Sequence, residues 1–207
     1  MDPLTQGLLG ASCGQALYGR ALGRQAIVWG ALIGMTPDLD VVANPISPMA
    51  EWIWHRGPTH ALWFGPVVGP ALGFMLWRWR GGRLRDWVGL AVVALLTHPL
   101  LDAFTTYGTQ LLAPFSRQRF AWDAVAIVDP VYSLILVAGI VLGLRRGVGT
   151  PFAARAAATA LAVSTAYVLL GLAVNHRAER AARAQLAAEG VHAERVAAYP
   201  TLFQLPF

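Results

Sequence analysis

The hydrophobic positions of this chain gather into six segments, which are separated by short connections rich in Arg, Pro or acidic residues. The last two segments are long enough to span a bilayer, which requires about 20 helical residues. The first two are shorter and rich in Gly and Ala, which favours a tightly packed hairpin or helices half-embedded near one face. We therefore expect an all-α fold, a polytopic membrane helix bundle of about six membrane-embedded helices. The segments cover approximately residues 4–18, 26–35, 61–77, 87–104, 124–144 and 152–174.

Composition supports this interpretation. Of the 207 residues, 56% are hydrophobic and 13% are charged, whereas soluble domains carry about 25% charged residues. The pI of about 10.1 does not indicate a nucleic-acid partner, because most of the Arg residues lie in clusters that flank the apolar segments. The expected partner is the lipid bilayer. The single Cys13 indicates neither a disulfide nor a Cys metal site.

The arginine clusters predict the orientation of the chain in the membrane. Arg20 and Arg24 separate the first two segments, and further clusters lie within 78–85 and 145–155. If these connections are cytoplasmic, the other connections lie at the external face, and of the eleven acidic residues only Asp86 is left inside. We expect a multi-pass protein of a bacterial inner membrane with its active site facing the periplasm. The first segment should be retained, because no basic region precedes it and no convincing cleavage site follows it.

The most informative polar residues are His98 and Asp102, which lie four residues apart inside an apolar run. On a helix this spacing places both side chains on one face, where they can bind one metal ion. Ionisable groups in such a segment are costly and need a partner or a function. The alternative is a helix-terminal pair that is hydrogen-bonded to its neighbours.

Two further polar segments carry the same kind of side chain. Asp38 and Asp40 follow the second apolar segment, and carboxylates at that spacing can bind one ion or bridge two. His55 and His60 lie in a segment with Arg56, whose guanidinium can bind a phosphate or another oxyanion. The alternatives are caps or turn residues for the aspartates and an interfacial loop for the histidines. The spacing of the histidines matches neither a zinc finger nor the His-Glu-x-x-His helix of metalloproteases.

Together these residues predict a metal site that opens at the external face. Zinc is the expected metal, because the candidate ligands are a mixture of His and Asp. Asp123 or Asp129, which bracket the start of the fifth segment, is expected to act as a base or to orient a ligand. The predicted metal ligands are Asp38, Asp40, His55, His60, His98 and Asp102, and the predicted catalytic residues are Asp38, Arg56 and Asp123.

In these segments the chain resembles a known family, the YdjM-like predicted inner-membrane, metal-dependent hydrolases. The resemblance covers the N-terminal two-thirds of the chain in the family's order. Many members have a His where this chain has Gln6, so the chain is similar to the branch with Gln there, and a glutamine is a weaker metal ligand. The matching stretches are Asp2-Pro3-Leu4-Thr5-Gln6-Gly7, Pro37-Asp38-Leu39-Asp40, His55-Arg56-Gly57-Pro58-Thr59-His60, His98-Pro99-Leu100-Leu101-Asp102 and Thr105-Thr106-Tyr107-Gly108-Thr109.

That family is thought to be distantly similar to zinc-dependent phospholipase C and to S1/P1-type nucleases. Those enzymes bind clustered zinc ions with a His-x-x-x-Asp pair on a helix, which His98 and Asp102 match. The resemblance implies one to three zinc ions and a membrane-embedded hydrolase that cleaves a phosphoester, in a phospholipid or a lipid-linked substrate, with metal-activated water.

Two other functions are compatible with the sequence. The metal cluster of a non-catalytic membrane protein would be structural and closed, whereas a catalytic site keeps an open position. A transporter would use intramembrane acids for ion coupling and would carry them near mid-membrane, whereas the acids of this chain collect at one face. In domain terms, we expect residues 1–176 to form the membrane-embedded metal-site domain. Residues 177–207 would form an external amphipathic tail, the start of a soluble domain.

Overall fold

The computed structural model describes residues 1–41 and 55–201, and these residues are mainly helical with no strand. One isolated antiparallel bridge joins Thr109 and Phe120. The prediction of an all-α fold is confirmed for this part of the chain. Residues 202–207, the end of the predicted tail, lie outside the described residues.

Each of the six predicted segments contains a helix. The fifth helix begins later than expected, because Asp129 caps it by accepting a hydrogen bond from the Tyr132 backbone N–H, and Pro130 fits the first helical position. The helices are α1 (Pro3–Cys13), α2 (Gly19–Leu22), α3 (Arg24–Met35), α5 (Phe64–Arg80), α6 (Leu84–Ala103), α7 (Pro130–Arg146) and α8 (Pro151–Ala188); the short elements are the π-helix η1 (Gly14–Tyr18) and the 3-10 helices η2 (Thr36–Val41) and η3 (Pro58–His60).

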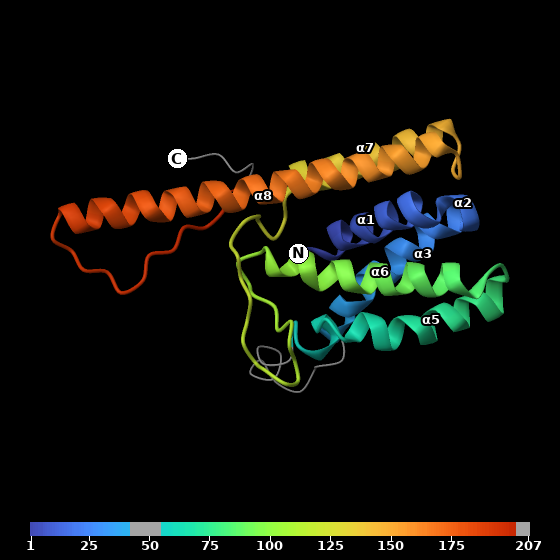
Figure 1. The fold of residues 1–207 in the computed structure, drawn as a ribbon, viewed down its shortest axis with the longest axis horizontal. Helices are drawn as coiled ribbons and strands as arrows, with labels where there is room; N and C mark the ends of the chain where they lie inside the picture. The colour runs from blue at the N-terminus through green and yellow to red at the C-terminus, as the bar shows by residue number, and fades with distance from the viewer. Residues whose placement is uncertain (42–54, 202–207) are drawn as a thin grey trace.

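The long helices form three antiparallel pairs, which are α1 with α3, α5 with α6, and α7 with α8 (Figure 1). Helix α1 packs against members of both other pairs, and α6 contacts α1, α3 and α5. One buried cluster joins α1, α6, α7 and α8 around Leu9, Leu101 and Leu136. A second joins α3, α5 and α6 around Ile33 and Leu90. Helix α6 therefore connects the two halves of the core.

Glycine allows the closest of these approaches. A Cβ atom added at Gly10 of α1 would clash with the carbonyl group of Gly30 in α3, and one added at Gly30 would clash with that of Gly10. The two backbones are thus in direct contact, which is the role expected for the small residues of these segments. This contact fixes the positions of α1 and α3 relative to each other, and both helices pack against α6.

The ends of the bundle differ in their chemistry. The turns within all three helix pairs lie at one end, and these are the connections that carry the arginine clusters (Figure 1). The chain's N-terminus, η3 and the C-terminal end of α6 lie at the opposite end (Figure 1). The structure thus separates the arginine-bearing turns from the candidate ligands, as the sequence predicted.

The expectation of about six membrane-embedded helices is not met by helix length. Among the described residues, two helices are long and apolar enough to cross a bilayer, α6 with 20 residues and α8 with 38. Helix α3 has 12 residues and measures about 18 Å, well short of a hydrocarbon core of about 30 Å. Helix α1 has 11 residues and continues through the π-helix η1 into α2. Helices α5 and α7 have 17 residues each, the lower limit of about 17 for a span. An apolar run in the sequence therefore overestimated the number of spans.

Candidate metal centre

The candidate centre forms where three elements meet at the end of α6. His98 and Asp102 lie in the last turns of α6, Asp38 lies in η2, and His60 ends η3. Pro37 cannot donate a backbone hydrogen bond, and the chain changes from the α-helix of α3 to the 3-10 helix η2 around it. Each ligand segment is therefore positioned by a helix end, and together they bring residues 38, 60 and 98–102 into one site.

The ligand atoms of these four residues all lie within 4.8 Å of one another. The two imidazole Nε2 atoms of His60 and His98 are 3.0 Å apart. Asp38 Oδ1 lies 3.4 Å from His98 Nε2 and 3.5 Å from His60 Nε2. Asp102 Oδ2 lies 3.4 Å from His60 Nε2. Two nitrogens and two carboxylate oxygens thus face a common centre.

Both imidazole rings have a hydrogen-bond partner at Nδ1, the nitrogen that faces away from the centre. His98 Nδ1 lies 2.6 Å from the backbone oxygen of Gly34, which can only accept a hydrogen bond, so Nδ1 carries the proton and Nε2 presents its lone pair to the centre. His60 Nδ1 lies 3.0 Å from Thr59 Oγ1, on the side of the ring away from the centre. Metal-binding histidines usually have their second nitrogen held in this way.

Buried carboxylate oxygens without a hydrogen bond indicate that the site could hold a cation. Asp38 Oδ2 and Asp102 Oδ2 are buried and have no hydrogen-bond partner, and Asp102 Oδ2 has the Arg56 Nε atom 3.2 Å away as an ion-pair partner. His60, His98 and Asp102 are at most 1% exposed. A buried carboxylate oxygen without a donor is costly, and a divalent cation bound by two imidazoles and two carboxylates would satisfy it. The four side chains therefore fit a metal ion by both donor type and burial.

Protonation of the metal-free site follows the same arrangement. Burial raises the pKa of the Asp38 carboxyl, but the neighbouring imidazoles of His60 and His98 outweigh burial and hold that pKa well below its usual range. Burial lowers the pKa of His60, but hydrogen bonds to Asp102 and Asp38 outweigh burial and raise that pKa above the usual histidine value. In the absence of metal, a proton on the His60 imidazole thus supplies the positive charge that a metal ion would supply.

Asp40 and His55 lie beside this centre rather than within the four-residue cluster. Asp40 Oδ1 is 2.9 Å from His55 Nδ1, and Asp40 Oδ2 accepts hydrogen bonds from the Arg56 backbone N–H at 3.0 Å and from Thr59 Oγ1 at 3.2 Å. These contacts connect η2 to the segment that carries His60. In this geometry Asp40 and His55 support the site from outside the cluster.

Arg56 takes a different position from the one expected for a residue that binds a substrate anion. Its side chain is buried, its Nε atom lies 3.2 Å from Asp102 Oδ2, and its Nη1 donates to Thr105 Oγ1 at 2.9 Å. The guanidinium also lies over the ring of Tyr107, 4.8 Å from its centroid. Arg56 therefore faces a candidate ligand, and it is positioned to hold Asp102.

Asp123 lies on the loop before α7 and outside the four-residue cluster. Its backbone oxygen accepts a hydrogen bond from the side chain of Asn175 in α8. Burial raises the pKa of the Asp123 carboxyl, and the negative charge of Glu179 raises it further. The surroundings of Asp123 thus belong to the contact between this loop and α8.

Sequence reasoning did not assign roles to several groups that hold the site. Gln6 Nε2 donates to Asp102 Oδ1 at 2.8 Å and to the backbone oxygen of His98 at 3.2 Å. The Met1 amine also contacts Asp102 Oδ1. Gln6 was recognisable as part of a motif, but its contact with α6 depends on helix packing, and the Gly34 carbonyl has no side-chain signal at all.

The same contacts correct the expectation of a site that opens at the external face. Met1 and Gln6 cover Asp102 on one side, and Arg56 covers it on another, so the cluster is buried. Asp38 is the most exposed of the four, with 10% of its side-chain surface accessible.

Comparisons with known proteins agree with the membrane assignment. The chain is 34% identical over 120 residues to the inner membrane protein YbcI of Escherichia coli (strain K12), a match that covers 55% of this chain and 69% of that protein. It is 29% identical over 126 residues to the uncharacterised protein YfhP of Bacillus subtilis (strain 168), covering 59% of this chain and 38% of that protein. No solved structure matches. The profile of the YdjM inner membrane protein family matches residues 1–178, and the chain belongs to this family.

Proposed function

We propose that this chain binds a divalent metal ion, with zinc the first candidate, and uses it to hydrolyse a phosphoester at the membrane. The observation that carries the proposal is the buried cluster of Asp38, His60, His98 and Asp102, in which two carboxylate oxygens have no hydrogen-bond partner. Two imidazoles and two carboxylates form a donor set that zinc accepts, and other divalent transition metals accept it as well.

A divalent ion in such a site lowers the pKa of a nearby water molecule and stabilises negative charge on a phosphoryl oxygen. The residues of the chain would supply the rest. Asp38, the most exposed member of the cluster, would accept the proton of an attacking water with a carboxylate oxygen that does not bind the ion. Arg56 and Gln6 would hold Asp102 in place from both sides. In the reaction, water adds to phosphorus, the phosphorus–oxygen bond to the alcohol breaks, and the alcohol leaves with a proton.

The position of the cluster favours a substrate of the membrane surface. The centre lies at the end of the bundle opposite the arginine-bearing turns (Figure 1), and the positive-inside rule assigns such turns to the cytoplasm. The site would then face the periplasm of an inner membrane. A phosphoester carried on a lipid reaches this position by lateral diffusion.

A structural metal site is the second candidate, and the burial of the ligands favours it. Structural zinc sites are closed by protein ligands, whereas catalytic sites keep a position for water or substrate. Here four side chains face the centre, and three of them are at most 1% exposed. In this function the ion would connect η2 and η3 to α6 without any turnover.

Metal content and turnover, measured on the same purified full-length protein, separate these functions. We expect near-stoichiometric zinc, which His98→Ala and Asp38→Asn should remove or strongly reduce. His176→Ala is the matched control, because this histidine is 61% exposed and lies outside the cluster. Hydrolysis of phosphodiester and phosphomonoester lipids should depend on the ion and be lost in the cluster variants.

Two results would count against hydrolysis. If bound metal is present and its removal unfolds the protein, but no phosphoester lipid is turned over, the structural function is supported. If neither the wild type nor the control variant binds a divalent metal, both functions are wrong.

A further inference from the structure

Arg80 is the last residue of α5, at the arginine-bearing end of the bundle, and contacts with α3 hold its side chain in place. Its Nε donates a hydrogen bond to Gln25 Oε1 at 3.0 Å. Its guanidinium lies 4.7 Å from the centroid of the Trp79 ring and 5.9 Å from that of the Trp29 ring. The two rings meet edge to face, with their centroids 5.6 Å apart. We call these four residues the Arg80 cluster.

The charge of Arg80 is not neutralised by a carboxylate in the described part of the chain. Asp86 is the one acidic residue that the sequence places at this end, and it pairs with Arg83 at 3.4 Å and with Arg85 at 3.8 Å. Within residues 1–41 and 55–201, Arg80 donates to Gln25 through Nε, and its Nη1 and Nη2 groups have no protein acceptor. These two groups form a planar fork whose N–H donors match two oxygens of a phosphate.

Arg80 also lies at the depth where a membrane has its lipid phosphates. Helix α6 has 20 residues and is about 30 Å long, which matches a hydrocarbon core of about 30 Å. Its first residue, Leu84, should then lie at one surface of that core, and residues 81–83 alone separate it from Arg80. Trp77 and Trp87 donate hydrogen bonds from Nε1 to backbone oxygens of this turn. Tryptophan is enriched at the boundary between lipid and water.

The balance of charge at this end favours a lipid with a net negative charge. The turns within the three helix pairs carry several arginines, and Asp86 is the acid among them. Clusters of arginine beside a membrane attract anionic phospholipids. A zwitterionic lipid offers the same phosphate but adds a positive charge to it. In a protein of an inner membrane family, an anionic phospholipid is therefore the partner that complements this surface.

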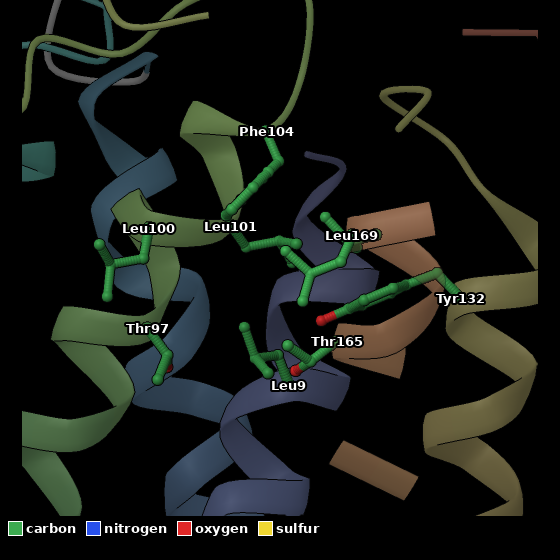
Figure 2. A pocket seen from close by; sticks show the side chains of 9 residues that line it. Leu9, Thr97, Leu100, Leu101, Phe104, Tyr132, Thr165 and Leu169 are labelled. Carbon is green, nitrogen blue, oxygen red and sulfur yellow. The ribbon is translucent and has the colours of Figure 1, made fainter. Parts of the chain in front are cut away.

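The cavity between α1, α6, α7 and α8 offers no comparable partner for a phosphate. It has a volume of about 240 Å³, and the side chains around it are apolar except for the hydroxyls of Thr97, Tyr132 and Thr165 (Figure 2). No charged side chain lines it among the described residues. A negatively charged headgroup in this cavity would lack a cation, whereas at the Arg80 cluster it would meet one.

We propose that the Arg80 cluster binds the phosphate of an anionic phospholipid in the leaflet at the arginine-bearing end. Arg80 would donate from Nη1 and Nη2 to two phosphate oxygens, while Gln25 orients the guanidinium through Nε. Trp79, which is 67% exposed, would contact the glycerol and the first carbons of the acyl chains. The Arg80 cluster lies at the opposite end of the bundle from the metal centre (Figure 1), so this inference does not depend on the proposed hydrolysis.

The test titrates phosphatidylglycerol into the full-length protein in a neutral detergent and counts bound lipids by native mass spectrometry. Arg80→Gln should weaken the tightest binding about tenfold, because it removes hydrogen bonds to a charged group. Arg78→Gln is the matched control. It removes the same charge from an exposed position of the same helix, but its side chain is turned by about 200° from that of Arg80, so binding should be nearly unchanged.

Gln25→Ala leaves the net charge unchanged and should also weaken binding, because the guanidinium loses the acceptor that orients it. Weakening by Arg80→Gln and Gln25→Ala that persists in a His98→Ala background would support the lipid site whether or not the protein hydrolyses a phosphoester.

Three results would overturn the inference. Equal weakening by Arg80→Gln and Arg78→Gln would indicate general attraction to a basic surface rather than a site. Equal affinity for phosphatidylcholine would show that the net charge of the lipid is not recognised. Displacement of the bound phosphatidylglycerol by millimolar inorganic phosphate would identify a soluble anion as the ligand.

Discussion

Asp102 is held from several directions by residues that are far from it in the sequence. Gln6 donates to its Oδ1, the Met1 amine contacts the same oxygen, and Arg56 lies beside its Oδ2. A charged group buried without its partners is destabilising by several kcal/mol. At the scale of single residues, the site therefore depends on the groups around the ligands as much as on the ligands.

Arg56→Ala should lower the free energy of unfolding by about 3 kcal/mol, because it leaves the buried Asp102 carboxylate without this partner. Thermal unfolding of the purified protein in detergent would measure the change. Arg117→Ala, at an exposed position in the loop before α7, is the control and should have little effect. Equal stability of the two variants would show that the ion pair of Arg56 contributes nothing.

Asp123→Asn should stabilise the protein at neutral pH by a small amount. The pKa of Asp123 is raised in the folded state, first by burial and then by Glu179. The folded state then holds its proton more tightly than the unfolded state, so the contribution of Asp123 to stability falls as pH rises through this pKa. The advantage of the variant should thus appear above that pKa and disappear below it.

Urea unfolding at several pH values would measure this difference. Asp123 also has a positive φ of 49°, a conformation that Asn tolerates well. A gain in stability that is the same at all pH values would come from the backbone and would contradict the electrostatic explanation.

The residue types of the site could be predicted from the sequence, but their individual positions could not. His98 and Asp102 were recognisable because a four-residue spacing on a helix fixes a common face. Asp38 and Asp40 could not be distinguished, because both are carboxylates in one short segment. In the 3-10 helix η2, two residues are separated by about 240° of rotation, and only Asp38 joins the cluster.

At the scale of elements, both α1 and α3 contact residues of the site. Gln6 of α1 contacts Asp102, and the carbonyl of Gly34 in α3 contacts His98. Both contacts depend on the spacing of the two helices, which the Gly10–Gly30 approach sets. A change in the spacing of α1 and α3 should therefore shift the positions of Asp102 and His98.

Gly10→Ala should reduce stability by about 1–3 kcal/mol, the usual cost of overpacking, and should weaken metal binding as well. A chelator competition assay and thermal unfolding measure the two effects. Gly19→Ala is the control, because the nearest atoms to an added Cβ there lie at 4.0 Å. Wild-type metal affinity in Gly10→Ala would show that helix spacing does not position the ligands.

The positions of the helices were readable from apolar runs and from the Arg, Gly and Pro residues at their ends. The number of membrane spans could not be read in this way, because an apolar run is expected both for a helix buried in lipid and for a helix buried in protein. Helices α1 and α3 bury small residues against each other, and this packing explains their composition without requiring that either crosses a bilayer.

At the scale of the whole molecule, the separation of basic turns from the metal centre is the main feature (Figure 1). The sequence predicted it, because the positive-inside rule depends only on where Arg residues fall relative to apolar runs. The rule assigns the Arg83 turn to the cytoplasm and the loop that contains Phe115 to the outside.

Cysteine labelling in spheroplasts tests this orientation. A membrane-impermeant maleimide should modify Phe115→Cys but not Arg83→Cys, and lysis should make the second site accessible. Phe115 is 89% exposed and the Arg83 side chain is 60% exposed, so both positions are open to reagent. The buried native Cys13 should remain unlabelled. The reverse labelling pattern would place the metal centre in the cytoplasm.

The order of the ligands along the chain also affects biosynthesis. Asp38 precedes His98 by sixty residues, and at about 5–20 residues per second a ribosome needs roughly 3–12 s to make that stretch. During this interval the nascent Asp38 carboxylate has no α6 partner. The four side chains could hold an ion together only after α6 has been translated and has packed, so any metal loading would wait for that step.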